Sequence, residues 1–137
     1  MTRPGSRKKV PADFWESRRR AGRDFLKAAQ DGLAIAESGD GGAPIMSNVI
    51  LAAIAYGDAL TAKRANVVNS EDHHAAPRLL RDVLKQELPA LQEKRFVDTL
   101  RNKSVIQYGA KTFIRAEAEN FLLNFEPFAS WADEQLV

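Results

Sequence analysis

Apolar residues recur at three- and four-residue spacings along most of the chain, which is the pattern of amphipathic helices. The spacing predicts a first helix from Asp13 to about Glu37 and an alanine-rich second helix over residues 45–65. Three glycines and a proline fall within residues 38–44, a composition that a helix does not sustain. We therefore expect a loop between these two helices.

The second half of the chain continues the same pattern. Ser70 is suited to the N-cap of a third helix, which we expect to end or bend at Pro89. A fourth helix is predicted over residues 90–108, with Gly109 as a left-handed cap, and a fifth over residues 115–136. No segment alternates convincingly between polar and apolar residues, so we expect no sheet. The predicted fold is all-α, an antiparallel four- to five-helix up-down bundle.

Composition sets the domain organisation. The chain has 137 residues, of which 45% are hydrophobic, enough for one domain with a moderate core. We expect a disordered basic N-terminal tail over residues 1–12 and a single helical domain over residues 13–137. There is no cysteine, which excludes disulfides and thiolate zinc sites. The start of the chain lacks the apolar core of a signal peptide, and no uninterrupted apolar run approaches about 18 residues. We expect a cytoplasmic protein that does not span a membrane.

The charge is unevenly distributed. Residues 1–27 contain nine Lys and Arg against three Asp and Glu, although the net charge is only +2. The cations of the first helix form a basic face, which is either a solvated surface or a nucleic-acid-binding stripe; they are Arg18, Arg19, Arg20, Arg23 and Lys27. The glycines of residues 39–42 follow no strand and precede no lysine–serine pair, so they do not form a phosphate-binding loop.

The run from Leu100 to Tyr108 carries the main functional clue. It resembles the R-x4-H-x-Y signature of the HEPN superfamily, named for higher eukaryotes and prokaryotes nucleotide binding, with Arg101 and Tyr108 in place but Ile106 at the histidine position. The resemblance extends over most of the chain, through three further segments that match in order and spacing: 52–60, 70–74 and 115–119.

The resemblance implies a helical bundle in which active members cleave RNA without a metal. Their histidine moves protons and their arginine stabilises the phosphate, near a dimer interface. Ile106 can do neither job, whereas Arg101 can still bind a phosphate and Tyr108 can stack on a base. The alternative is purely structural: Arg101 pairs with Asp98 or Glu93, Ile106 lies in the core, and Tyr108 packs with its hydroxyl at the rim.

Asp72, His73 and His74 form the other candidate site. Adjacent helical residues point about 100° apart, so the two histidines cannot both converge on one metal, and we expect no metal site and no cofactor. We expect one histidine to turn inward and bond a carboxylate, with Asp58 of the second helix as the candidate, while the other stays in water. At a cleft or dimer seam, the inward histidine is a candidate surrogate base.

Three functional hypotheses follow. The first is a catalytically degenerate HEPN-like binding or regulatory module, a homodimer that contacts nucleotide or RNA or acts with a nucleotidyltransferase partner. The second is an active, metal-independent ribonuclease of toxin type that uses His73 or His74 as base. The third is a nucleic-acid-binding or adaptor protein that uses the basic first helix. Seven phenylalanines and two tryptophans in 137 residues favour leftover apolar surface for a homodimer.

Overall fold

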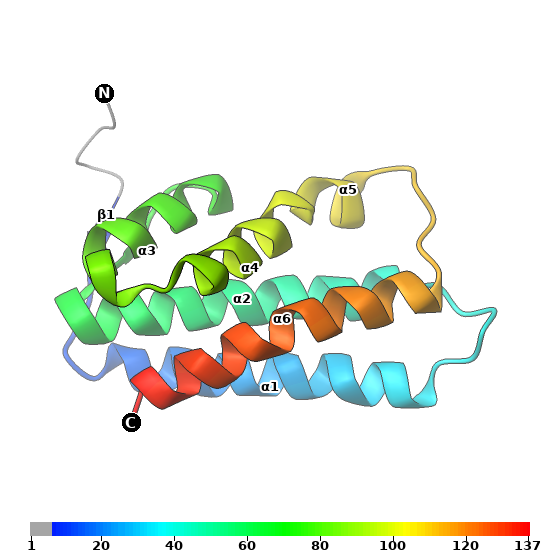
Figure 1. Ribbon diagram of the computed structural model, residues 1–137, viewed down its shortest axis with the longest axis horizontal. Coiled ribbons are helices and arrows are strands. Elements are labelled where there is room, and N and C mark those ends of the chain that lie inside the picture. Colours follow the sequence, from blue (N-terminus) through cyan, green and yellow to red (C-terminus); the bar gives the residue numbers. More distant parts are fainter. Residues whose placement is uncertain (1–6) are drawn as a thin grey trace.

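The computed structural model describes residues 7–137 and confirms the all-α bundle. Two long antiparallel helices, α1 (Phe14–Ile35) and α2 (Ala43–Ala65), lie along each other, and α6 (Arg115–Gln135) runs beside both. The shorter helices α3 (Ala76–Leu84), α4 (Ala90–Arg101) and α5 (Lys103–Tyr108) cover the side of α2 that faces away from α1 (Figure 1). The 3-10 turns η1 (His73–Ala75) and η2 (Lys85–Glu87) flank α3.

Helix α2 is the centre of the bundle. It contacts α1, α3, α4, α5 and α6, and alanine along its length lets these neighbours approach closely. By length and composition α2 would also suffice to cross a membrane, but 72% of its most apolar window is buried inside the bundle. Its apolar character is therefore explained by its central position. Two glycines lie directly against aromatic rings of the core: a Cβ at Gly22 would lie 2.9 Å from the Tyr56 ring, and one at Gly57 would lie 2.8 Å from Phe96.

A short sheet contradicts the expectation of none. β1 (Arg7–Lys9) pairs antiparallel with β2 (Val67–Asn69), with Arg7 opposite Asn69. The expected disordered tail covered residues 1–12; residues 1–6 lie outside the described part, and residues 7–9 form this strand. Asn66 ends α2 in the left-handed conformation (φ 56°), which Asn tolerates, and so turns the chain directly into β2.

Two helix boundaries differ from the sequence expectation. Asp72, not Ser70, is the cap: its Oδ1 accepts a hydrogen bond from the His74 backbone at 2.9 Å, and it starts η1 rather than α3. The expected helix over residues 90–108 is divided at Asn102. The Asn102 side chain donates to the carbonyl of Asp98 at 2.8 Å, a local bond that competes with regular helix geometry.

The expected left-handed conformation at Gly109 is also wrong, since its φ is −78°. Glycine is nevertheless required there by a close approach. A Cβ at Gly109 would lie 2.5 Å from the carbonyl oxygen of Val105. The last turn of α5 therefore excludes any side chain at this position.

Candidate functional site

The residues of the R-x4-I-x-Y run lie on two helices and do not converge. Arg101 ends α4 with a side chain that is 69% exposed, and its guanidinium lies 3.5 Å from Asp98 Oδ1. Ile106 is 6% exposed and belongs to the core. These positions agree with the structural alternative, in which Arg101 pairs with a carboxylate and Ile106 lies in the core. The partner of Arg101 is Asp98, and Glu93 pairs instead with Arg81.

Tyr108 differs from the structural alternative. It is 78% exposed and does not pack against the bundle with only its hydroxyl at the rim. The ammonium of Lys103 lies 5.5 Å from its ring centroid, within the range of a cation–π contact. Tyr108 and Arg101 are therefore surface residues, whereas Ile106, which lies between them in the run, is buried.

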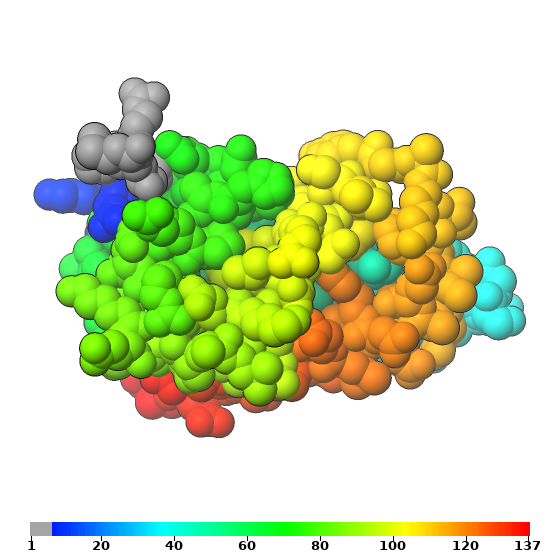
Figure 2. Space-filling model, turned by 45° about the horizontal axis from the view of Figure 1, so that its top comes forward, coloured from blue at the N-terminus to red at the C-terminus, as the bar shows by residue number. Residues whose placement is uncertain are grey.

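A cleft lies instead between α2, η1 and the start of α5. It has a volume of about 310 Å³ and is referred to below as the α2–α5 cleft. Figure 2 shows a notch on this face between the green segment near residue 73 and the yellow α5. The lining combines two apolar residues with six polar ones: Ile54, Ala76, Asp58, Asn69, Glu71, Asp72, His73 and Lys103.

Each element brings its residues to the cleft for a local reason. Ile54 and Asp58 are four residues apart on α2 and therefore share one side of the helix. The loop before η1 is organised by Asn69, whose amide donates to the carbonyls of Glu71 (3.2 Å) and Asp72 (2.9 Å) and accepts from the Glu71 backbone. Lys103 is the first residue of α5, directly after the break at Asn102.

His73 is the half-buried member of the histidine pair, and His74 is exposed. Their ring centroids are 4.2 Å apart. Burial lowers the pKa of His73, and the neighbouring His74 and Lys103 act in the same direction, against the effect of Asp72. His73 Nε2 is buried without a hydrogen-bond partner within residues 7–137. An unpaired buried nitrogen of this kind costs about 1–3 kcal/mol, so it is a group that a ligand could satisfy.

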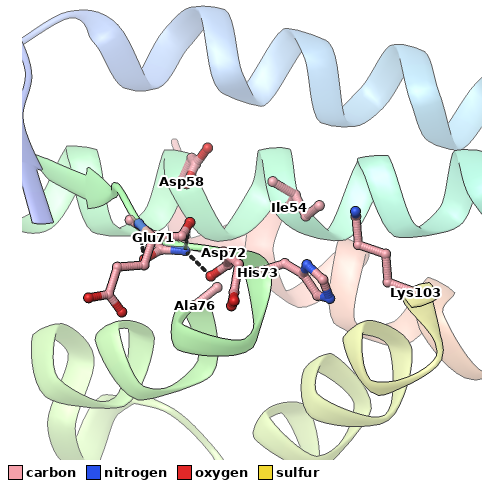
Figure 3. A pocket seen from close by; sticks show the side chains of 8 residues that line it. Ile54, Asp58, Glu71, Asp72, His73, Ala76 and Lys103 are labelled. Atoms are coloured by element: carbon pink, nitrogen blue, oxygen red, sulfur yellow. Dashed lines mark hydrogen bonds between the residues drawn. The ribbon is translucent and has the colours of Figure 1, made fainter. Parts of the chain in front are cut away.

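The expected bond between a histidine and Asp58 is absent from the described structure. Asp58 turns toward α1 instead, where its Oδ2 lies 3.6 Å from Arg18 Nε. Burial raises the pKa of Asp58 to about 6, and the positive charge of Arg18 partly opposes that rise. Figure 3 shows why the pairing fails: Asp58 and His73 both border the cleft, but Asp58 points toward α1 and the imidazole points toward Lys103.

The basic face of α1 is less free than the sequence suggested. Arg19 and Arg23 both contact Asp133 of α6, at 3.3 and 3.2 Å, and Lys27 contacts Asp31 at 2.6 Å. With Arg18 at Asp58, four of the five cations already have a carboxylate partner. This leaves little of the face for phosphates, because binding an anion there would require breaking those contacts.

The aromatic series of the last helix serves the core. Phe125 and Phe128 are fully buried in α6, whereas Phe121 and Trp131 are half-buried against the core. Phe128 stacks on Phe96 of α4 with centroids 5.1 Å apart. These rings hold α4 against α6 and line none of the polar cleft.

Five of the eight residues that line the cleft were not predicted as site residues from the sequence: Ile54, Asn69, Glu71, Ala76 and Lys103. Lys103 falls within the run from Leu100 to Tyr108, directly after Asn102. The low helix propensity of asparagine could have indicated a helix break at this point. The contact between Arg18 and Asp58 depends on how α1 packs on α2. The spacing of apolar residues along the chain does not predict that packing.

Comparisons with protein-family models, with curated proteins and with solved structures gave no match. Within residues 7–137, no three His, Asp or Glu side chains are grouped so as to hold a metal ion.

Proposed function

We propose that the protein is a catalytically degenerate HEPN-like binding module of the cytoplasm that holds a nucleotide-class ligand in the α2–α5 cleft. The observation that carries this proposal is the unpaired, buried Nε2 of His73 in a cleft that also contains the ammonium of Lys103. Ligand sites are concave and combine apolar surface with a few precisely placed polar groups. An imidazole and an ammonium are groups that bind phosphate and nucleobase edges.

The degenerate character is supported by the position of Ile106. Its side chain is 6% exposed among core residues, so neither a proton-transfer group nor a phosphate approaches it. Arg101 lies on the open surface beside Asp98. Because acid–base catalysis needs the two groups within hydrogen-bonding reach of one reacting atom, the run does not form that arrangement within one chain.

The direct test is a titration of the purified protein with mononucleotides and short RNA, followed by calorimetry or NMR. Binding should be at least about tenfold weaker in His73→Ala, since a hydrogen bond from the ligand to this imidazole is worth about 1.5 kcal/mol or more. His74→Ala is the matched control, because His74 is adjacent but exposed. Equal weakening in both variants, or no binding by the wild-type protein, would contradict the proposal.

A second candidate function is metal-independent RNA cleavage with His73 as the base. It is favoured by one observation: the lowered pKa of His73 leaves the imidazole neutral at physiological pH, as a general base requires. Cleavage of RNA in the presence of a chelator, abolished in His73→Ala and retained in His74→Ala, would replace the binding proposal with this one. We expect no cleavage.

The proposal includes a homodimer, and a nucleotidyltransferase as a candidate partner. Apolar side chains are exposed around α5 and its linker, with Val105 at 45%, Tyr108 at 78% and Ile114 at 56% exposure. Burying such side chains between copies would be favourable. Light scattering should give twice the monomer mass for the wild type and the monomer mass for Val105→Asp. Leu91→Asp, at an exposed position on α4, is the control.

A further inference from the structure

Two groups without hydrogen-bond acceptors meet at the end of the α2–α5 cleft that is nearest α5. Figure 3 shows the His73 imidazole pointing toward the Lys103 side chain, with Ile54 of α2 beside them. His73 Nε2 is buried and makes no hydrogen bond within residues 7–137. Lys103 forms no ion pair with any carboxylate of the same residues. Its ammonium lies 5.5 Å from the Tyr108 ring centroid, a contact that leaves its three N–H groups free to donate.

The carboxylates that border the cleft do not occupy this end. Asp58 points toward α1, and Glu71 points away from the imidazole (Figure 3). Asp72 precedes His73 directly, but its Oδ1 already accepts the backbone hydrogen bond that starts η1. An acceptor for the two nitrogen groups is therefore not supplied by the described part of the chain.

We infer that the α5 end of the α2–α5 cleft is an oxyanion site, in which one phosphate or carboxylate group accepts hydrogen bonds from the Lys103 ammonium and from His73 Nε2–H. The inference rests on the proposed function for the use of this cleft, and it names the group that the ligand must carry. A lysine ammonium binds such oxygens through charge-assisted hydrogen bonds. A neutral imidazole can carry its one proton on Nε2 and act as a donor. An anion with two or more oxygens can satisfy both groups at once.

The charges around His73 give the oxyanion site a measurable property. Burial lowers the pKa of His73, and the neighbouring His74 and Lys103 lower it further, against the effect of Asp72. An anion held between His73 and Lys103 would stabilise the imidazolium and so raise this pKa. Because the two effects are reciprocal, the anion should bind more tightly as pH falls through the pKa of His73.

The cleft is larger than an oxyanion alone requires. Its volume is about 310 Å³, whereas one water molecule takes about 30 Å³ in the liquid. Ile54 and Ala76 add apolar surface to the lining. The anionic group would therefore anchor one end of a larger ligand, and the remainder of that ligand would lie against these two residues.

The test follows the pKa of each histidine by NMR in inorganic phosphate, in acetate and in sodium chloride of equal ionic strength. The chain has only two histidines, and His74→Gln identifies their signals. His74 is adjacent and exposed, so it is an internal control. The variants are Lys103→Met and the matched control Lys94→Met, whose side chain is 71% exposed and pairs with Asp98. Circular dichroism verifies that each variant is folded.

Saturating phosphate or acetate should raise the measured pKa of His73 by about one pH unit in the wild type, relative to sodium chloride. Lys103→Met should raise it without any added oxyanion, because a neighbouring positive charge is removed, and should abolish the response to phosphate and acetate. Lys94→Met should respond as the wild type does. A larger response to phosphate assigns the site to a phosphate ester, and a larger response to acetate assigns it to a carboxylate.

The results that would overturn the oxyanion site differ from those that would overturn the proposed function. If neither anion changes the pKa of His73 more than sodium chloride does, or if Lys103→Met responds as the wild type does, the oxyanion site is wrong. The proposed function survives that result if His73→Ala still weakens the binding of mononucleotides. If the anions act through both residues but neither mononucleotides nor RNA bind, the oxyanion site stands and the proposed function fails.

Discussion

Replacing Asp58 by asparagine should remove a loss of stability that appears as pH rises. The Asp58 side chain is 21% exposed and lies between α2 and α1, 3.6 Å from Arg18. Burial raises its pKa from the ordinary value of 3.8 to about 6, with the Arg18 charge acting in the opposite direction. Asparagine has nearly the same shape and no charge, so Asp58→Asn isolates the cost of ionising this carboxyl in the folded protein.

The sign and size follow from proton linkage. Below pH 3.8 Asp58 is protonated in both the folded and the unfolded state. As pH rises from 3.8 to about 6, the unfolded chain releases the proton first, so the free energy of unfolding decreases. Above about 6 the decrease is complete. The interval between 3.8 and about 6 corresponds, at about 1.36 kcal/mol per pH unit, to a loss of about 3 kcal/mol.

The assay is urea unfolding of wild type and Asp58→Asn at a series of pH values on both sides of this interval. The free energy of unfolding of Asp58→Asn minus that of the wild type should grow by about 3 kcal/mol from the acid to the neutral end. Using this difference cancels the other titrating groups, which both proteins share. Asp31→Asn, at a side chain 64% exposed, is the control for the substitution itself. A difference that stays constant with pH would refute the reasoning.

Three further substitutions test the packing. Gly57→Ala should lower the free energy of unfolding by about 1–3 kcal/mol, because the new Cβ would lie 2.8 Å from the buried Phe96 ring. Gly39→Ala is the control, since no atom lies within 4 Å of a Cβ at that position. Lys85→Gly should raise the free energy of unfolding by about 1 kcal/mol, since Lys85 has a φ of 53° that glycine adopts without strain. An unchanged urea midpoint would contradict this. Ile106→His should lower the free energy of unfolding by about 2 kcal/mol or more, because it places a polar imidazole in the core. A ribonuclease assay of this variant should find no cleavage.

The long helices could be predicted from the sequence because their stability comes from periodic burial. The expected first helix, from Asp13 to about Glu37, corresponds to α1, and Pro77 lies in the first turn of α3, where it is tolerated. The β1–β2 pair could not be predicted in this way, since three residues are too few for alternation to appear. The strand at Arg7–Lys9 is exposed throughout, so it carries no apolar signal at all.

The candidate site was predicted only in part. His73 and Asp58 do line one cleft, but the direct bond expected between them depends on side-chain direction, and Asp58 turns toward Arg18. The break at Asn102 has a local cause, the hydrogen bond from its side chain to the Asp98 carbonyl. The free-energy difference between this bond and a continuous helix is too small to be predicted from residue types alone. That break decides where α5, and with it Lys103, begins.

The pairing of β1 with β2 also bears on when the cleft can form during folding. Arg7 pairs with Asn69, and the same Asn69 holds the loop that leads to His73. These partners are separated by on the order of 60 residues, and contacts at such separation form slowly because the intervening chain must first be ordered. Helices α1 and α2 can associate before this strand pair closes. Ligand binding at the cleft should therefore be acquired on refolding only after this strand pair has closed.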